Sequence, residues 1–239
     1  MPTSSDAARV AVLVTHEAAG VDDTGIIGDY LATRGCRVIR HQVFATIEAQ
    51  DPNVDLPSLD GVDLVIVFGS TEHAWEEKSR HWVDVETAWV RSALDRDIRV
   101  VGICFGSQIL ALALGGAVRP TGRVEAGMLT FDVEDGCPVA AGPWFSWHSD
   151  IVSIPDGATR WASSTVGPQV FTHGTALGMQ FHPEVSHELA LEWIDAWPNS
   201  LPDDVSPEQF REQVAARVEE SQAGCRAMLD WALDGARVS

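Results

Sequence analysis

Basic side chains are scarce in this chain of 239 residues. Lysine and arginine together number 16 against 35 aspartates and glutamates, so the formal net charge is −19. Such a surface repels a phosphate backbone, which argues against a nucleic-acid-binding protein. An anionic membrane surface is disfavoured for the same reason. We therefore expect neither nucleic acid nor a membrane among the partners of this protein.

Long apolar runs are also missing, since no stretch reaches the roughly 20 consecutive apolar residues that a membrane-spanning helix needs. The first residues lack a basic segment ahead of their short apolar run, which is typical of a strand rather than a secretion signal. The four cysteines, at positions 36, 104, 137 and 225, show no paired spacing. This pattern predicts reduced thiols in a cytoplasmic protein rather than a disulfide framework.

Hydrophobic residues make up 45% of the chain, which excludes disorder over its whole length. Through the first half, strand and helix signals alternate. The expected strands are 8–16, 36–44, 62–70 and 99–104, and the expected helices are 25–35, 81–95 and 107–116. This order predicts the α/β class, with an open, mostly parallel, doubly wound sheet of the flavodoxin-like kind.

The second half of the chain has a different pattern. Short strands separated by turn residues follow from 117 to 181 and predict antiparallel strands added to the sheet. Two helical patterns then follow at 186–197 and 206–235, with a proline-containing break between them. We expect one domain over 1–198, with a linker and a C-terminal helix over 199–239 that is packed on it or appended to it.

A cysteine between two glycines stands where the fourth expected strand passes into a helix. In RVVGICFGSQ, Cys104 lies between Gly102 and Gly106, a G-x-C-x-G pattern typical of a strand–turn–helix elbow that presents a nucleophile. Glycines let the backbones approach at the sharp turn, and the start of the helix favours a thiolate. The next backbone N–H, of Phe105, would point toward a developing oxyanion. The alternative for Cys104 alone is a small buried core residue.

The segment GMQFHPEVS, at 178–186, supplies a histidine that could serve such a cysteine. His182 follows an apolar run, so it should lie at the carboxyl end of a strand, where open α/β sheets bind ligands. Pro183 keeps His182 out of the helical region, and residues two apart in an extended segment point the same way. Glu184 can then orient a histidine that acts as general base. A surface histidine in a turn is the alternative when this segment is taken alone.

Together, GICFGSQ and QFHPE resemble the motifs of the class I, or triad, glutamine amidotransferases. The resemblance runs from about residue 8 to about residue 197, and it is nearest to the glutaminase domain of GMP synthetase and its free-standing relatives. It implies the fold of that family and hydrolysis of the γ-amide of L-glutamine to glutamate and ammonia. The route would be a γ-glutamyl thioester on Cys104, with ammonia passed to a separate synthetase subunit or acceptor.

The same resemblance implies roles for individual residues. Cys104 would be the nucleophile, His182 the proton donor and base, and Glu184 the group that orients His182. The remaining candidates would hold the oxyanion or the substrate: Gly69, Ser70, Phe105, Gln108, Trp147, His148 and Ser149. The family usually has Gly-Gly-Pro in its oxyanion loop, whereas this chain has Gly-Ser-Thr at 69–71. The N–H of Ser70 would remain a donor, but a side chain stands where glycine normally leaves room.

Two other functions stay open on the sequence. A γ-glutamyl hydrolase or peptidase would use the same three residues on another γ-glutamyl amide, and a non-catalytic regulatory subunit could keep the same fold. No cofactor is expected, because the chain has no phosphate loop of the Walker type. No metal is expected either, because His182 and its neighbours lack the HExxH spacing and Pro183 excludes the helix that such a motif needs.

Overall fold

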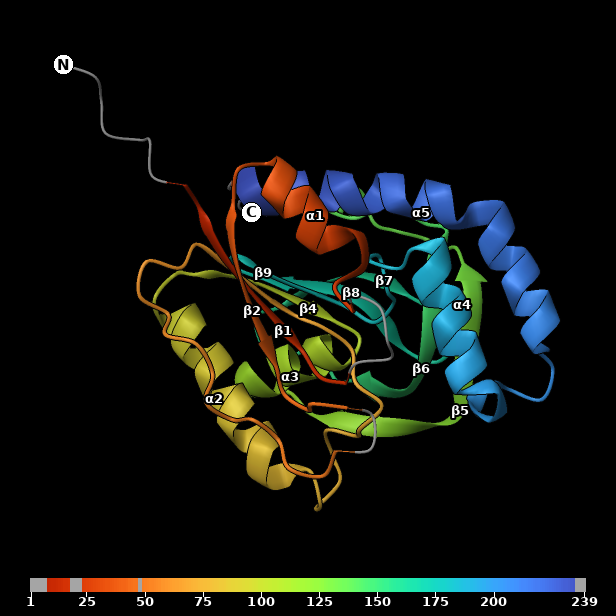
Figure 1. Ribbon diagram of the computed structural model, residues 1–239, viewed down its shortest axis with the longest axis horizontal. Helices are drawn as coiled ribbons and strands as arrows, with labels where there is room; N and C mark the ends of the chain where they lie inside the picture. The colour runs from red at the N-terminus through yellow and green to blue at the C-terminus, as the bar shows by residue number, and fades with distance from the viewer. Residues whose placement is uncertain (1–7, 18–22, 47–48, 235–239) are drawn as a thin grey trace.

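A computed structural model describes residues 8–17, 23–46 and 49–234, shown in Figure 1. The expectation that no secretion signal is present falls partly on 1–7, outside the described residues. The first half contains β1 (Val10–Thr15), α1 (Gly25–Thr33), β2 (Arg37–Gln42), β3 (Leu64–Val67), α2 (Arg80–Asp95), β4 (Arg99–Ile103) and α3 (Phe105–Ala113). Each of these elements lies inside or beside a segment expected from the sequence.

The second half begins with β5 (Val118–Leu129), β6 (Trp144–Val152), β7 (Thr159–Ser163), β8 (Pro168–His173) and β9 (Ala176–Met179). It ends with α4 (His187–Ala196), a short 3₁₀ turn at Pro198–Ser200 and the long helix α5 (Pro207–Asp234). In the part of the chain that the structure describes, no helix combines the length and hydrophobicity needed to cross a membrane.

The main sheet has seven strands in the order β2-β1-β3-β4-β9-β8-β7. All neighbours from β2 to β9 pair in parallel, whereas β8 runs antiparallel to both β9 and β7. The predicted α/β class with a mostly parallel sheet is therefore confirmed. Because β9 pairs in parallel with β4, the segments that follow these two strands lie at the same edge of the sheet.

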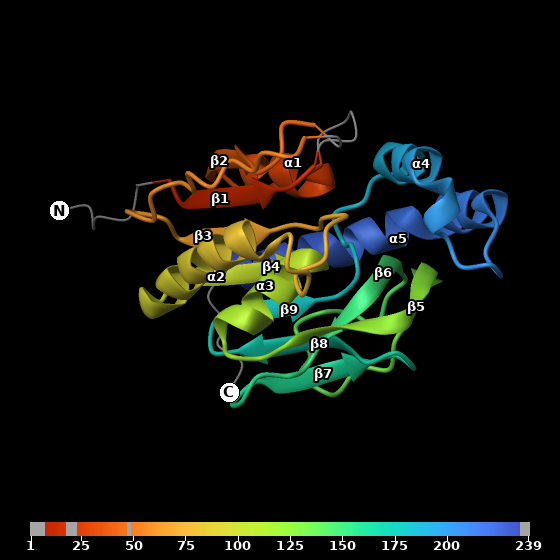
Figure 2. The same cartoon turned by 90° about the horizontal axis from the view of Figure 1, so that it is seen from below.

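The expectation that all the later strands join this sheet is wrong for β5 and β6. These two strands form a separate antiparallel pair. Their apolar side chains, among them Met128 and Phe145, form a cluster with Phe210 of α5 and Leu189 of α4 instead of extending the main sheet. Figure 2 shows the pair standing beside the main sheet and below α4.

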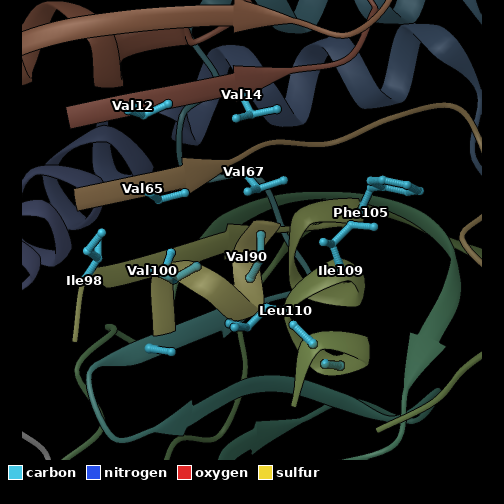
Figure 3. Packing of buried hydrophobic residues seen from close by; sticks show 14 of the residues in the cluster. Val12, Val14, Val65, Val67, Val90, Ile98, Val100, Phe105, Ile109 and Leu110 are labelled. Carbon is cyan, nitrogen blue, oxygen red and sulfur yellow. The ribbon is translucent and has the colours of Figure 1, made fainter. Parts of the chain in front are cut away.

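Helices cover both faces of the main sheet, because successive strand residues point to opposite faces. Val12, Val14, Val65 and Val67 pack toward α2 and α3 (Figure 3), while alternate residues such as Leu13 face α1 and α5. The helix expected at 206–235 is α5, which packs on α1, α4 and the β5–β6 pair. The division into 1–198 and 199–239 stays a prediction.

Candidate active site

Cys104 occupies the turn between β4 and α3 in a backbone conformation that residues with a side chain rarely adopt. Its φ is 50° and its ψ is −107°. A Cβ on Gly102 would lie 2.4 Å from the carbonyl oxygen of Gly106, and a Cβ on Gly106 would lie 2.0 Å from that of Val67. Positions 102 and 106 therefore both need glycine. Such strain at a non-glycine residue is typical of functional sites.

His182 lies beside this elbow, on the segment that follows β9. Its Nδ1 donates to Oε1 of Glu184 at 2.7 Å, and its backbone N–H donates to the carbonyl of Phe145 at 2.7 Å. The His182 and Glu184 side chains are 5% and 1% exposed. Burial alone lowers the pKa of His182, but the charges of Glu184 and Cys104, and hydrogen bonds to both, raise it to about 10. The arrangement therefore favours an imidazolium next to the sulfur.

Residues 69–71 follow β3, and Gly69 lies against the His182 ring. A Cβ on Gly69 would be 2.7 Å from Cε1 of His182, so a side chain at this position would collide with the ring. The Ser70 hydroxyl donates to Oε1 of Glu17 at 2.7 Å, and the backbone N–H of Thr71 donates to the same atom at 3.2 Å. The Ser70 hydroxyl is thus hydrogen-bonded to the Glu17 carboxylate.

The start of α3 supplies backbone donors close to Cys104. The N–H of Gly106 donates to the carbonyl of Phe68, and the N–H of Ser107 donates to that of Cys104. Among the hydrogen bonds of the described residues, none engages the N–H of Phe105. The Phe105 ring is buried and stacks on Trp82 with a centroid distance of 5.4 Å. The group of Phe105 that is left for a ligand is therefore its backbone N–H.

A cavity of about 280 Å³ opens above these groups. The structure brings the predicted site residues together around it, except for Phe105, which is not among the lining residues. The lining includes Gly69, Ser70, Cys104, Gln108, Trp147, His148, Ser149, His182 and Glu184. Both ring nitrogens of His148 have partners within the protein, namely a Glu125 carboxylate oxygen at 2.9 Å and the Asp150 carbonyl at 3.0 Å. The His148 ring is therefore fixed in the wall of the cavity.

Further groups lie at the cavity or beside it, and of these the sequence indicated only His73, which belongs to the polar connection expected to overhang the site. His73 donates to Asp150 at 2.6 Å, and Trp75 donates to the same carboxylate at 3.0 Å, which ties the loop before α2 to β6. The Gln180 amide donates to the sulfur of Cys104 at 3.6 Å. His16 lies directly after β1, so the rule that ligands bind at the carboxyl ends of strands could have found it. No comparable signal marks Gln180.

Histidines around the cavity are paired with carboxylates, as His182 is with Glu184 and His148 is with Glu125. Across the three described ranges, no group of three or more histidine, cysteine, aspartate or glutamate side chains is placed to hold a metal ion. The groups that this site offers for chemistry are a thiol, imidazole rings, carboxylates and backbone donors.

Comparisons with known proteins agree with this geometry. The model of the family "Glutamine amidotransferase class-I" matches residues 23–194. A glutamine-hydrolysing GMP synthase of Thermobifida fusca is 38% identical over 103 residues, 39% of this chain, but the match spans 19% of that relative's length. One subunit of a glutamine-hydrolysing GMP synthase from Thermoplasma acidophilum is 32% identical over 146 residues, 57% of this chain and 70% of the relative.

Solved structures of glutamine amidotransferases superpose on nearly the whole chain. A glutamine amidotransferase from Thermotoga maritima superposes with a TM-score of 0.80 at 25% identity, covering 95% of this chain and 99% of that one. One from Methylobacillus flagellatus shares the fold, with a TM-score of 0.77 over 98% of both chains. With a family model that matches most of its length, this chain belongs to the class I glutamine amidotransferase family.

Proposed function

We propose that this protein hydrolyses the γ-amide of L-glutamine to glutamate and ammonia, with Cys104, His182 and Glu184 as its catalytic residues. One observation carries the proposal. A cysteine on a strained elbow lies beside a buried histidine, whose Nδ1 donates to Glu184 at 2.7 Å, and all three line one cavity. A positioned nucleophile, a base and a group that orients the base are what acyl transfer requires.

The residues suggest the following steps. The Cys104 thiolate attacks the γ-carbonyl carbon of glutamine, and the N–H groups of Phe105 and Ser70 hold the resulting oxyanion. The His182 imidazolium gives a proton to the departing nitrogen, so the C–N bond breaks, ammonia leaves and a γ-glutamyl thioester remains on the sulfur. Neutral His182 then takes a proton from water, which attacks the thioester and releases glutamate. Glu184 keeps the ring oriented through both steps.

The ammonia would pass to a synthetase on a separate polypeptide in the cytoplasm. Two relatives, from Thermoplasma acidophilum and Sulfolobus acidocaldarius, are each named as one subunit of a glutamine-hydrolysing GMP synthase. Those names support a division of labour between polypeptides. The formal net charge of −19 would favour a partner with a basic docking face.

The test compares release of glutamate from L-glutamine with release from γ-glutamyl amides that carry larger amines. We expect the wild-type protein to hydrolyse glutamine and Cys104→Ala to lose this activity. Higher kcat/KM on a larger amide would instead identify a γ-glutamyl hydrolase or peptidase that uses the same residues. Failure to hydrolyse any of these amides, with or without a candidate synthetase, would contradict the proposal.

A further inference from the structure

We propose that His16 is a positioning residue for the oxyanion loop. Together with Glu86, it fixes the peptide between Gly69 and Ser70 so that the Ser70 N–H faces the substrate. This inference rests on the proposed function, because the Ser70 N–H has a task only if an oxyanion forms above Cys104. His16 itself acts through the backbone of another residue.

Three separate parts of the fold meet at this contact. His16 follows β1, Glu86 lies on α2, and Gly69 follows β3. Nδ1 of His16 lies 2.9 Å from the carbonyl oxygen of Gly69, and Nε2 lies 3.1 Å from Oε2 of Glu86. The His16 and Glu86 side chains are 0% and 2% exposed. The contact is therefore shielded from water. In such an environment hydrogen bonds to charged groups are strong.

The partners of the ring indicate its protonation. A carbonyl oxygen and a carboxylate oxygen can only accept hydrogen bonds, so each ring nitrogen of His16 must donate while Glu86 is ionised. His16 is then an imidazolium. Burial by itself lowers the pKa of His16, but the charge and hydrogen bond of Glu86, the charge of Glu17 and the Gly69 carbonyl together raise it.

The bond to Gly69 controls the direction of the Ser70 N–H. The Gly69 carbonyl and the Ser70 N–H belong to one planar trans peptide, in which they point in opposite directions. A donor that holds the carbonyl on the side of β1 thus turns the N–H the other way. Glycine at position 69 leaves the backbone free to turn, because it has no Cβ. Something outside the loop must therefore select the orientation.

The same ring also contacts the residue that carries the other proposed donor. His16 packs edge-on to the Phe105 ring with a centroid distance of 4.8 Å, and Phe105 stacks on Trp82. One buried side chain thus lies against both Phe105 and the Gly69–Ser70 peptide. His16 therefore contacts the side chain of the residue that carries one proposed donor and the peptide that contains the other.

Two substitutions of His16 separate its two bonds. In His16→Asn, the amide nitrogen can take the place of Nδ1 and keep the bond to Gly69. In His16→Gln, the longer side chain places its amide nitrogen near the position of Nε2 and keeps the bond to Glu86. Since losing one oxyanion donor costs about 10²–10³ in kcat, we expect His16→Gln to lose about 100-fold in kcat and His16→Asn less than about tenfold. KM should change little in either variant.

Alkylation of Cys104 by iodoacetamide serves as the control, because that reaction develops no oxyanion. Its rate should stay near the wild-type value in both variants, which would show that the elbow is intact. Equal kcat in His16→Asn and His16→Gln would overturn the proposal, as would a loss of kcat matched by an equal loss of alkylation. Either result would mean that His16 does not act on the reaction through its bond to Gly69.

A crystal structure of His16→Gln keeps this test independent of the proposed function. We expect the Gly69–Ser70 peptide to be turned or disordered in that variant and unchanged in His16→Asn. A peptide in the wild-type orientation in His16→Gln would overturn the positioning role. If the wild-type protein hydrolyses no γ-glutamyl amide, the proposed function fails, while the crystallographic comparison still tests what His16 holds.

Discussion

Two buried histidine–glutamate pairs lie next to Gly69. His182 and Glu184 are two residues apart on one segment, whereas His16 and Glu86 are 70 residues apart on a strand end and a helix. In both pairs one ring nitrogen is bonded to a carboxylate. The other nitrogen differs: that of His182 is left for Cys104, while that of His16 is bonded to a backbone carbonyl. We infer that the contact of the second nitrogen decides whether a pair transfers protons or only holds structure.

The largest loss is expected when the pair that we propose to transfer protons, His182 and Glu184, is broken. His182→Asn should lower kcat by about 10²–10⁴-fold, because general acid–base catalysis contributes about that much and His182 would act in both steps. Measurement of kcat for glutamine hydrolysis checks this, with His16→Asn as the matched substitution in the other pair. A loss below tenfold in His182→Asn would show that the two pairs do not differ as we infer.

Replacing the carboxylate should likewise lower kcat more in the His182 pair than in the His16 pair. Glu184→Gln removes the charge that stabilises the imidazolium, and we expect kcat to fall by up to about 10⁴-fold, no more than in His182→Asn, while alkylation of Cys104 persists. Glu86→Gln should cost less than about fivefold, because neutral His16 can still donate from Nδ1 to the Gly69 carbonyl. Full activity in Glu184→Gln would remove Glu184 from the catalytic group, and the reverse order of effects would contradict the comparison.

Stability should depend on pH through the same histidines. The pKa of His182 is raised to about 10 in the folded protein, above its ordinary value of 6.5. A raised pKa stabilises the fold fully below pH 6.5, and this contribution is lost as the pH rises to about 10. One proton contributes at most about 1.4 kcal/mol per pH unit. Urea unfolding between pH 7 and 10 should show a steeper loss for the wild type than for His182→Asn, and equal slopes would contradict the assignment.

The smallest effect is expected at the unusual residue of the oxyanion loop. Ser70→Gly keeps the backbone N–H but removes the hydroxyl bonded to Glu17 at 2.7 Å. We expect kcat to fall about threefold, close to the value of one ordinary hydrogen bond. In Ser70→Pro, which deletes the backbone N–H, kcat should fall about 100-fold. Similar losses in the two variants would mean that the side chain matters and the backbone donor does not.

The sequence predicted the first histidine pair and could not predict the second. The Pro183 constraint and the alternation of an extended segment place Glu184 beside His182 through local geometry alone. The pairing of His16 with Glu86 depends instead on how α2 packs on the sheet and on which face of that helix is buried. Likewise, the alternation of strands and helices predicted the parallel sheet, whereas the separate β5–β6 pair results from packing against α4 and α5.

The central claim is that Cys104 is a nucleophile activated within a site shaped for glutamine. The glutamine analogue 6-diazo-5-oxo-norleucine tests it directly, with intact-mass measurement and peptide mapping of the wild type and of Cys104→Ala. We predict one adduct per wild-type chain, on the peptide that contains Cys104, formed more slowly when L-glutamine is in excess. Absence of an adduct on the wild type, or an equal adduct on Cys104→Ala, would contradict the account.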